Sequence, residues 1–196
     1  MLFLPSCCRA VTTLATGGSK HYALSCVRVR QAPGARFRVE ATDGRVLGIV
    51  HGRSAPTPAD LEAARDLPRP EVLALEALVP AGVLRKAFRA LPGDRSLGVL
   101  LGDPVLLAAG ETVSRCAADP GRYPDVEGVL AKAPALVSIR VDPDLLITLL
   151  KTAAAVSQAG DRPGVELLWW GPDKPLGVTA QGAGGVFFDG LLMPMT

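Results

Sequence analysis

The chain has 196 residues, of which 48% are hydrophobic and 20% are charged. This composition excludes a disordered tail and allows one large or two small domains, each with a buried core. Lysine and arginine number 21 against 19 aspartates and glutamates, so bulk charge does not indicate a polyanion binder, and any nucleic-acid contact must come from local charge placement.

The cysteine pattern bears on metal binding and on the cellular compartment. The four cysteines, Cys7, Cys8, Cys26 and Cys116, show no CxxC spacing, and only two histidines accompany them. We therefore expect no metal site and no disulfide framework, which favours a reducing compartment and hence the cytoplasm. The apolar start lacks the basic segment of an exported leader, and no apolar run reaches the ~18 residues of a membrane span. We expect a soluble protein.

Breaks rich in glycine and proline divide the chain into three units, and in each unit the sequence predicts a helix followed by strands. In the first unit, Phe3 to His51, we predict a short helix over Ser6 to Ala15 and strands over His21 to Arg30 and Arg36 to Ala41. Valines alternate with arginines in the first of these strands, which is typical of a strand with one wet face.

A proline-rich connector precedes the second unit. Its middle, residues 59–65, is compatible with one or two exposed helical turns in a surface loop. The second unit has a predicted helix over Ala81 to Leu91, with apolar residues on one face and Arg85, Lys86 and Arg89 on the other. The predicted strands of this unit are Val72 to Leu78, Leu97 to Leu101, Pro104 to Ala109 and Thr112 to Ala117.

The third unit repeats this order of helix and strands. A strand is predicted at Leu136 to Val141, followed by a helix over Pro143 to Ser157 that Asp142 caps. Val83, Leu84 and Phe88 of the second unit have apolar counterparts 62 positions later in this helix. The last predicted strands are Val165 to Trp170, Leu176 to Ala180 and Val186 to Met193.

Three local motifs occur in the order in which one known family has them. Residues 39–47 read VEATDGRVL, residues 121–125 read GRYPD with Lys132 shortly after, and residues 191–196 read LLMPMT. They resemble "ATDGHRLA", "GRFPDY…IPK" and "VVMPMRL" of the bacterial DNA polymerase III beta subunit, the sliding clamp. The strand at His21 to Leu24 and the helix after Pro80 also resemble that family.

The resemblance implies an α+β architecture, the DNA clamp fold, in which half-domains of one helix plus antiparallel strands repeat with helices on one face of the sheets. Residues 1–133 would form a complete clamp domain of two half-domain repeats, and residues 134–196 half a clamp domain. The family's first domain and part of its last have no counterpart. Because family rings contain twelve half-units, three per chain would give a homo-oligomer of four chains.

The function that the resemblance implies is a ring-forming processivity factor in DNA replication. It would encircle double-stranded DNA and bind DNA polymerase, repair and clamp-loader peptides, with no enzymatic activity and no cofactor. The alternative is a clamp-derived binding module or decoy that binds such peptides without encircling DNA. A third hypothesis, an enzyme with Cys7 or Cys8 as nucleophile, has little support because GxSxG, P-loop and HExxH motifs are missing from the sequence.

Two sets of site residues follow from the resemblance. DNA-binding residues on the lumen helices would be Arg85, Lys86, Arg89, Arg9, Lys20 and Lys151, although basic helix faces also serve solubility alone. The peptide-binding cleft would contain Leu24, Thr42, Gly44, Arg45, Leu47, Leu192, Met193 and Pro194, although such apolar residues also occur as ordinary core. Arg45 stands where the family often has histidine, Val46 replaces an arginine, and Thr196 ends the sequence without the usual Arg-Leu, so we expect altered peptide preference.

Overall fold

The computed structural model describes residues 1–15, 23–54, 56–65, 72–92, 95–129, 139–157, 164–171, 174–181 and 187–194. The chain forms two compact units, Met1–Gly128 and Val129–Thr196, which are described separately. The boundary predicted at 133/134 lies outside the described residues. None of the helices within the described ranges is long and apolar enough to cross a membrane.

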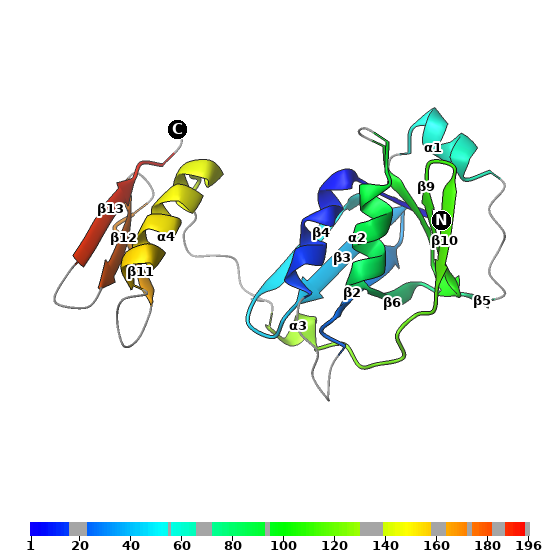
Figure 1. Cartoon of the computed structure of the whole chain (residues 1–196), viewed down its shortest axis with the longest axis horizontal. Coiled ribbons are helices and arrows are strands. Elements are labelled where there is room, and N and C mark those ends of the chain that lie inside the picture. Colours follow the sequence, from blue (N-terminus) through cyan, green and yellow to red (C-terminus); the bar gives the residue numbers. More distant parts are fainter. Residues whose placement is uncertain are drawn as a thin grey trace. The chain divides into compact units, whose positions relative to one another are not determined.

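The first half of unit 1 contains two short 3-10 helices and four strands (Figure 1). They are β1 (Leu2–Leu4), η1 (Ser6–Arg9), η2 (Val11–Leu14), β2 (Cys26–Ala32), β3 (Arg36–Thr42) and β4 (Leu47–Arg53). The short helix predicted over Ser6 to Ala15 is present as these two 3-10 helices. The hydroxyls of Thr12 and Thr13 donate to carbonyl oxygens three residues back, each at 2.7 Å, and such local bonds compete with regular α-helical bonding.

The prediction omitted β4 because its two glycines lower strand propensity. The structure gives a packing reason for one of them. A side chain at Gly48 would overlap Leu14 of η2, so glycine lets the 3-10 segment approach the strand closely.

The second half of unit 1 confirms the helix that was predicted after Pro80. Its elements are β5 (Val72–Leu73), β6 (Glu76–Pro80), α2 (Ala81–Arg89), β7 (Leu97–Leu100), β8 (Gly102–Asp103), β9 (Val105–Ala109), β10 (Thr112–Cys116) and α3 (Val126–Val129). The single strand predicted over Val72 to Leu78 is in fact two strands, since β5 pairs with β8 and β6 pairs with β2.

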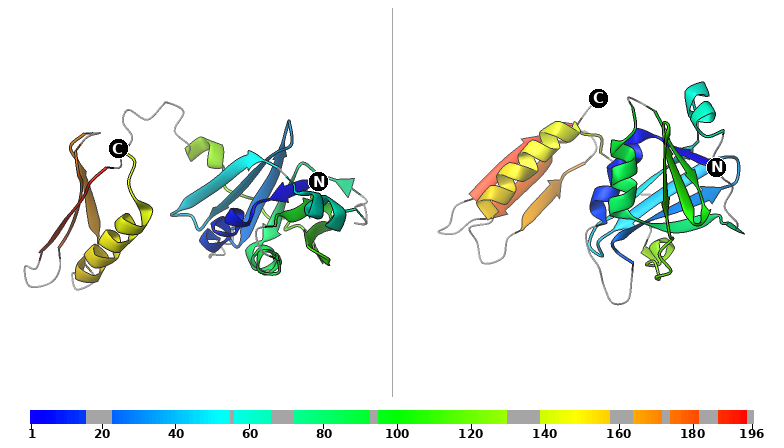
Figure 2. Two further views of the ribbon diagram at one scale, coloured as in Figure 1. Left: turned by 90° about the horizontal axis from the view of Figure 1, so that it is seen from above. Right: turned by 45° about the vertical axis from the view of Figure 1, so that its right-hand side comes forward.

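The two halves of unit 1 exchange the strands that lead directly into their helical segments, β1 before η1–η2 and β6 before α2. One sheet has the order β4-β3-β2-β6 and the other β1-β7-β9-β10, so each strand that precedes a helical segment pairs in the sheet of the opposite half. The helical segments η1–η2 and α2 lie side by side over these sheets (Figures 1 and 2). A single core, which includes Leu4, Val27, Val79 and Leu97, joins both sheets to the helices.

The connector before β5 is more tightly held than predicted. Its helix α1 (Pro58–Ala63) has a capping box, in which Asp60 N donates to Thr57 Oγ1 at 3.2 Å and Thr57 N donates to Asp60 Oδ2 at 3.0 Å. Arg95 Nε lies 3.3 Å from Asp60 Oδ1, and only 4% of Asp60 is exposed. The segment is an anchored helix and not simply a surface loop.

Unit 2 is one helix on a three-stranded antiparallel sheet of order β11-β12-β13. The helix is α4 (Pro143–Ser157), and the strands are β11 (Val165–Trp169), β12 (Leu176–Gln181) and β13 (Phe187–Leu192). Asp142 caps α4 as predicted, because its Oδ1 accepts from Asp144 N at 2.9 Å and from Leu145 N at 3.1 Å. Half of the strand predicted before α4, residues 136–138, lies outside the described residues, and residues 139–141 do not form a strand.

Candidate functional site

The basic face of α2 is set by the apolar face opposite. Ala81, Leu84 and Phe88 recur at helical spacing and are buried in the core of unit 1. This spacing turns Lys86 and Arg89 outward, where both are exposed, while Arg85 is half-buried and its Nε donates to the Ala81 carbonyl at 3.4 Å. Helix α2 contains no acidic residue, so its own sequence leaves these positive charges uncompensated.

The other expected DNA-binding residues divide among three places. Arg9 is exposed at the end of η1, on the helical segment beside α2. Lys151 is exposed on α4 of unit 2, at the position that corresponds to Arg89 in the 62-residue repeat. Lys20 lies outside the described residues. Unit 1 therefore brings four of the six expected residues onto adjacent helical segments.

The turn between β3 and β4 carries three residues of the expected peptide cleft. Asp43 Oδ1 accepts from Arg45 N at 2.8 Å and from Val46 N at 2.9 Å, which closes the turn and lowers the pKa of Asp43 below its ordinary value. Gly44 N donates to Thr42 Oγ1 at 3.0 Å. The turn exposes Gly44 and Arg45 while Thr42 is buried.

Leu24 and Leu47 lie at the base of this turn. Leu47 pairs with Thr42 in the β3–β4 register, and a Cβ built on Gly44 would lie 3.6 Å from Leu24 Cδ1. Leu24 is 9% exposed and Leu47 is half-buried. Within unit 1 the fold thus gathers all five expected cleft residues around one hairpin turn, with apolar side chains next to exposed backbone.

The remaining expected cleft residues end β13 in unit 2. Leu192 is 7% exposed and pairs with Leu176, so it belongs to the core of its own unit. Met193 is 64% exposed, and Pro194 is half-buried. Met193 is therefore the residue of this group that offers an accessible apolar side chain.

The conformation of Gly44 yields a first prediction. Its φ is +92°, a region that L side chains rarely adopt, so Gly44→Ala is expected to lower the free energy of unfolding by about 1–2 kcal/mol. Urea denaturation measures this change. The control is Gly82→Ala in α2, where a Cβ meets open space; it should be neutral or stabilising by up to ~1 kcal/mol. Equal effects of the two substitutions would contradict the argument.

A charge cluster on the outer face of sheet β4-β3-β2-β6 was not identified as a site from the sequence. The strand register places Glu40 opposite Arg28, and Arg30 between Arg38 and Glu76. The Glu40 side chain is fully buried, with Arg30 Nη1 at 3.8 Å, Arg28 Nη1 at 4.0 Å and Arg38 Nε in closer contact. The predicted wet face is therefore largely covered by its own ion pairs.

The segment that follows β10 lies over this cluster. Arg38 Nη1 is 2.8 Å and Arg30 Nη1 is 3.4 Å from Glu127 Oε1, and the Arg28 guanidinium lies 5.7 Å from the centre of the Tyr123 ring. Alternating charged residues on two neighbouring predicted strands were the available sequence signal. Their register, which makes the cluster, depends on pairing that the alternation alone does not specify.

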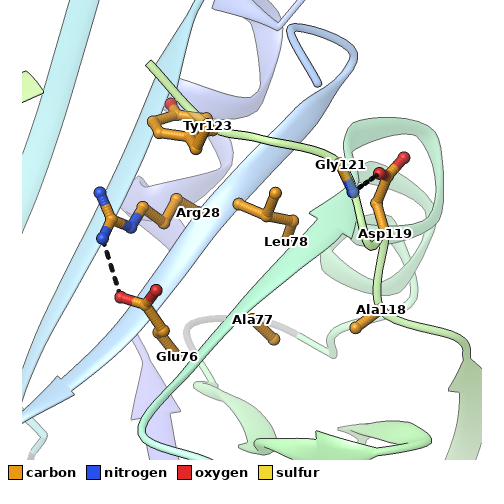
Figure 3. A pocket seen from close by; sticks show the side chains of 8 residues that line it. All are labelled: Arg28, Glu76, Ala77, Leu78, Ala118, Asp119, Gly121 and Tyr123. Atoms are coloured by element: carbon orange, nitrogen blue, oxygen red, sulfur yellow. Dashed lines mark hydrogen bonds and ion pairs between the residues drawn. The ribbon is translucent and has the colours of Figure 1, made fainter. Parts of the chain in front are cut away.

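A pocket of about 350 Å³ opens beside this cluster (Figure 3). Arg28, which is bonded to Glu76 at 2.9 Å, and Tyr123 form one side, and Leu78, Asp119 and the Gly121 backbone form the other. Burial first, and then the charge of Glu40, raise the pKa of Tyr123 well above its ordinary value.

The cysteine-nucleophile hypothesis gains no support from the geometry. Cys8 is buried, and its burial together with the neighbouring Cys7 raises the pKa of the Cys8 thiol to about 12. Reactive cysteines depend on the thiolate, which such a pKa suppresses. Cys7 is exposed, but it has no histidine or other base among the contacts that the structure shows for the described residues.

The exchanged strands, the antiparallel sheets and the helical segments laid side by side define the fold of unit 1, and unit 2 repeats one half of it, a helix on an antiparallel sheet. This is the DNA clamp fold, and the α+β architecture expected from the sequence is confirmed.

The solved structures that match this chain include bacterial DNA polymerase sliding clamps. The clamp of Pseudomonas aeruginosa matches with a TM-score of 0.72 and 18% identity, over 98% of this chain and 50% of that chain. The beta subunit of Streptococcus pyogenes DNA polymerase matches with a TM-score of 0.71 and 16% identity over 100% and 50%. The Bacillus subtilis clamp matches with 0.71 and 14% over 98% and 48%.

The chain thus spans about half the length of the clamps that it matches. At these identities the likeness establishes the fold alone. Comparison with protein-family models and with curated proteins finds no match.

Proposed function

We propose that the chain is a DNA sliding clamp, a ring-forming and non-enzymatic processivity factor that encircles duplex DNA. The observation that carries the proposal is the clamp fold with an uncompensated basic face on its helices, since Arg85, Lys86 and Arg89 project from α2. Duplex DNA carries about one negative charge per 1.7 Å, so a positive helical surface attracts it without reading bases.

The β3–β4 turn supports a second part of the proposal, the capture of short peptides from polymerases, loaders and repair proteins. Short segments gain affinity from apolar anchors next to a few polar groups. Leu24 and Leu47 offer such apolar contacts beside the Gly44 backbone and the Arg45 side chain. Met193, exposed at the end of β13, is proposed as a further apolar contact.

The number of subunits follows from counting half-units. Unit 1 contains two helix-plus-strands repeats and unit 2 contains one. Twelve such repeats, the number in the family's ring, require four chains and a mass of about 82 kDa, four times the 20.4 kDa of one chain. Most soluble homo-oligomers have closed symmetry, and a ring is one such form.

Topological retention on DNA tests the proposal without a clamp loader. A ring of separate chains is expected to dissociate on dilution and to reassemble around DNA when the protein is concentrated with a nicked circular plasmid. The chain should then elute with the plasmid in gel filtration, and cutting the plasmid once should release it. Negative-stain images of the same fraction should show rings.

Two outcomes would contradict the clamp proposal. One is a monomer at micromolar concentration, and the other is equal retention on circular and linear DNA. A monomer that still binds a polymerase-tail peptide in fluorescence anisotropy would support the alternative, a peptide-binding module derived from a clamp. The span of about half a clamp's length is the observation that favours this alternative.

A further inference from the structure

The three half-units of this chain have the same order of strands. In unit 2, one position of this order has no strand among the described residues. In the first half of unit 1 the strand after the helical segment is β2, and in the second half it is β7. Both are second from the edge of their sheets. The strand in the same sequence position of unit 2 is β11, and it is the end strand of a three-stranded sheet.

In unit 1 the partners of these strands come from the opposite half. β2 receives β6, with Cys26 paired to Pro80 and Arg30 paired to Glu76. β7 receives β1 in the same antiparallel sense. Among the described residues, β11 pairs with β12 only, so no described strand occupies the edge that takes an exchanged strand in both other half-units.

The apolar surface next to this edge is also uncovered. Leu84 of α2 is 0% exposed and belongs to the core that joins the sheets and helices of unit 1. The corresponding residue of α4 is Leu146, which is only half-buried, and its neighbour Leu145 is 58% exposed. On β11, Leu167 is 56% exposed although it lies opposite the fully buried Val178 on the face that α4 covers.

We propose that this surface, formed by the free edge of β11 with Leu145, Leu146 and Leu167, binds the same surface of a second copy of the chain. A partner must supply both an extended strand for the edge and an apolar helix beside it, which is what one half-unit supplies to the other in unit 1. Both half-units of unit 1 have already exchanged their strands, so the remaining half-unit with an unfilled place is unit 2 of another copy.

The association is two-fold symmetric, since each copy gives and receives the same elements. The inference rests on the fold and on the exposed residues of unit 2, and does not require that the assembly encircle DNA. A dimer that is not retained on circular DNA would leave it intact and would overturn the clamp proposal alone.

Analytical ultracentrifugation of the full chain tests the proposal. The unaltered chain should form an assembly with an even number of subunits, of about 41 kDa or a multiple, from chains of 20.4 kDa. Leu145→Glu combined with Leu167→Glu places charges in the contact and should weaken this association by at least about 30-fold. The mass at low micromolar concentration should fall at least by half.

The matched control is Leu191→Glu. Leu191 is 66% exposed and pairs with Gly177, where a Cβ would meet Trp170 and Leu168 on the sheet face that points away from α4. This variant should keep the mass of the unaltered chain, and circular dichroism should show the same fold for both variants. A monomeric unaltered chain, or equal masses of variant and control, would overturn the proposal.

Hydrogen exchange on the unaltered chain gives a second test that does not depend on the variants folding. The amides of β11 should exchange more slowly as the protein concentration rises through the association range, because a partner strand binds their free edge. Amides of β3, which is flanked by strands on both sides, serve as the internal reference. Exchange of β11 that is independent of concentration while the mass doubles would place the dimer contact elsewhere and overturn the proposal.

Discussion

Replacement of Arg38 by methionine is expected to lower the free energy of unfolding by about 3 kcal/mol, because it leaves a buried carboxylate with weaker compensation. Glu40 is fully buried, and Arg38 is the guanidinium nearest to it. Arg38 also holds Glu127 at 2.8 Å, so the substitution removes a bridge between β3 and the segment that covers it. Urea denaturation followed by circular dichroism measures the change.

A second substitution separates lost charge compensation from lost packing. Glu40→Gln in the Arg38→Met background removes the uncompensated charge at nearly unchanged volume and should recover at least half of the lost stability. The control is Arg36→Met on the same strand, where the arginine is exposed. Its effect should stay within about 0.5 kcal/mol. If Arg36→Met costs as much as Arg38→Met, or Glu40→Gln gives no recovery, the buried carboxylate is not the cause.

The pH dependence of the free energy of unfolding also reports on the buried carboxylate of Glu40. Burial raises the pKa of Glu40 above its ordinary value of 4.5, although Arg38, Arg28 and Arg30 oppose the increase. The folded chain therefore holds this proton at a higher pH than the unfolded chain does. The resulting stability is fully present below the ordinary pKa and is lost as the pH rises through the raised folded value. Glu40→Gln should abolish this contribution, while Arg38→Met should enlarge it.

Neutralising the basic face of α2 is the second large effect that we expect. The triple variant Arg85→Gln, Lys86→Gln, Arg89→Gln should weaken DNA binding steeply at low salt. If all three cations contact phosphates, the slope of log K against log salt should fall in magnitude by about 2.7, which is roughly 0.9 per contact. Fluorescence anisotropy with a labelled duplex at several salt concentrations gives this slope.

The control for this variant removes the same charge from strands. Arg36, Arg53 and Arg115 are exposed on β3, β4 and β10, and changing all three to glutamine alters the net charge equally. The binding slope of this control should stay near that of the unaltered chain. Equal losses for both triple variants would show that only net charge matters and would reject α2 as the DNA-binding face.

Much of the secondary structure could be predicted from the sequence because it follows local rules. Helix α2 has buried residues at helical spacing, and α4 begins at Asp142, whose carboxylate caps it in the structure. A short helix was predicted over Ser6 to Ala15, but its division into two 3-10 helices was not, because hydrogen bonds from threonine hydroxyls are a local detail that periodicity does not report.

The features that could not be predicted from the sequence depend on which strands pair in the folded chain. The turn that gathers Leu24, Thr42 and Gly44 follows from a recognisable motif, so its residues were predicted. The burial of Glu40 was not, because it depends on which strands lie beside β3 and on the segment that covers them. The exposed edge of β11 was missed for the same reason, since a strand's neighbours are a property of the sheet and not of its own residues.

The exchange of β1 and β6 between the two halves of unit 1 also sets the order in which strands can pair during synthesis. β1 pairs with β7, so Leu2 cannot pair until Val99 has been synthesised. The sheet β1-β7-β9-β10 therefore cannot form until at least about half of the chain has been made. At a translation rate of roughly 5–20 residues per second, this wait lasts on the order of 5–20 s. The nascent chain therefore carries an unpaired apolar strand at its start, and early β2–β3 hairpins form before their final neighbour β6 exists.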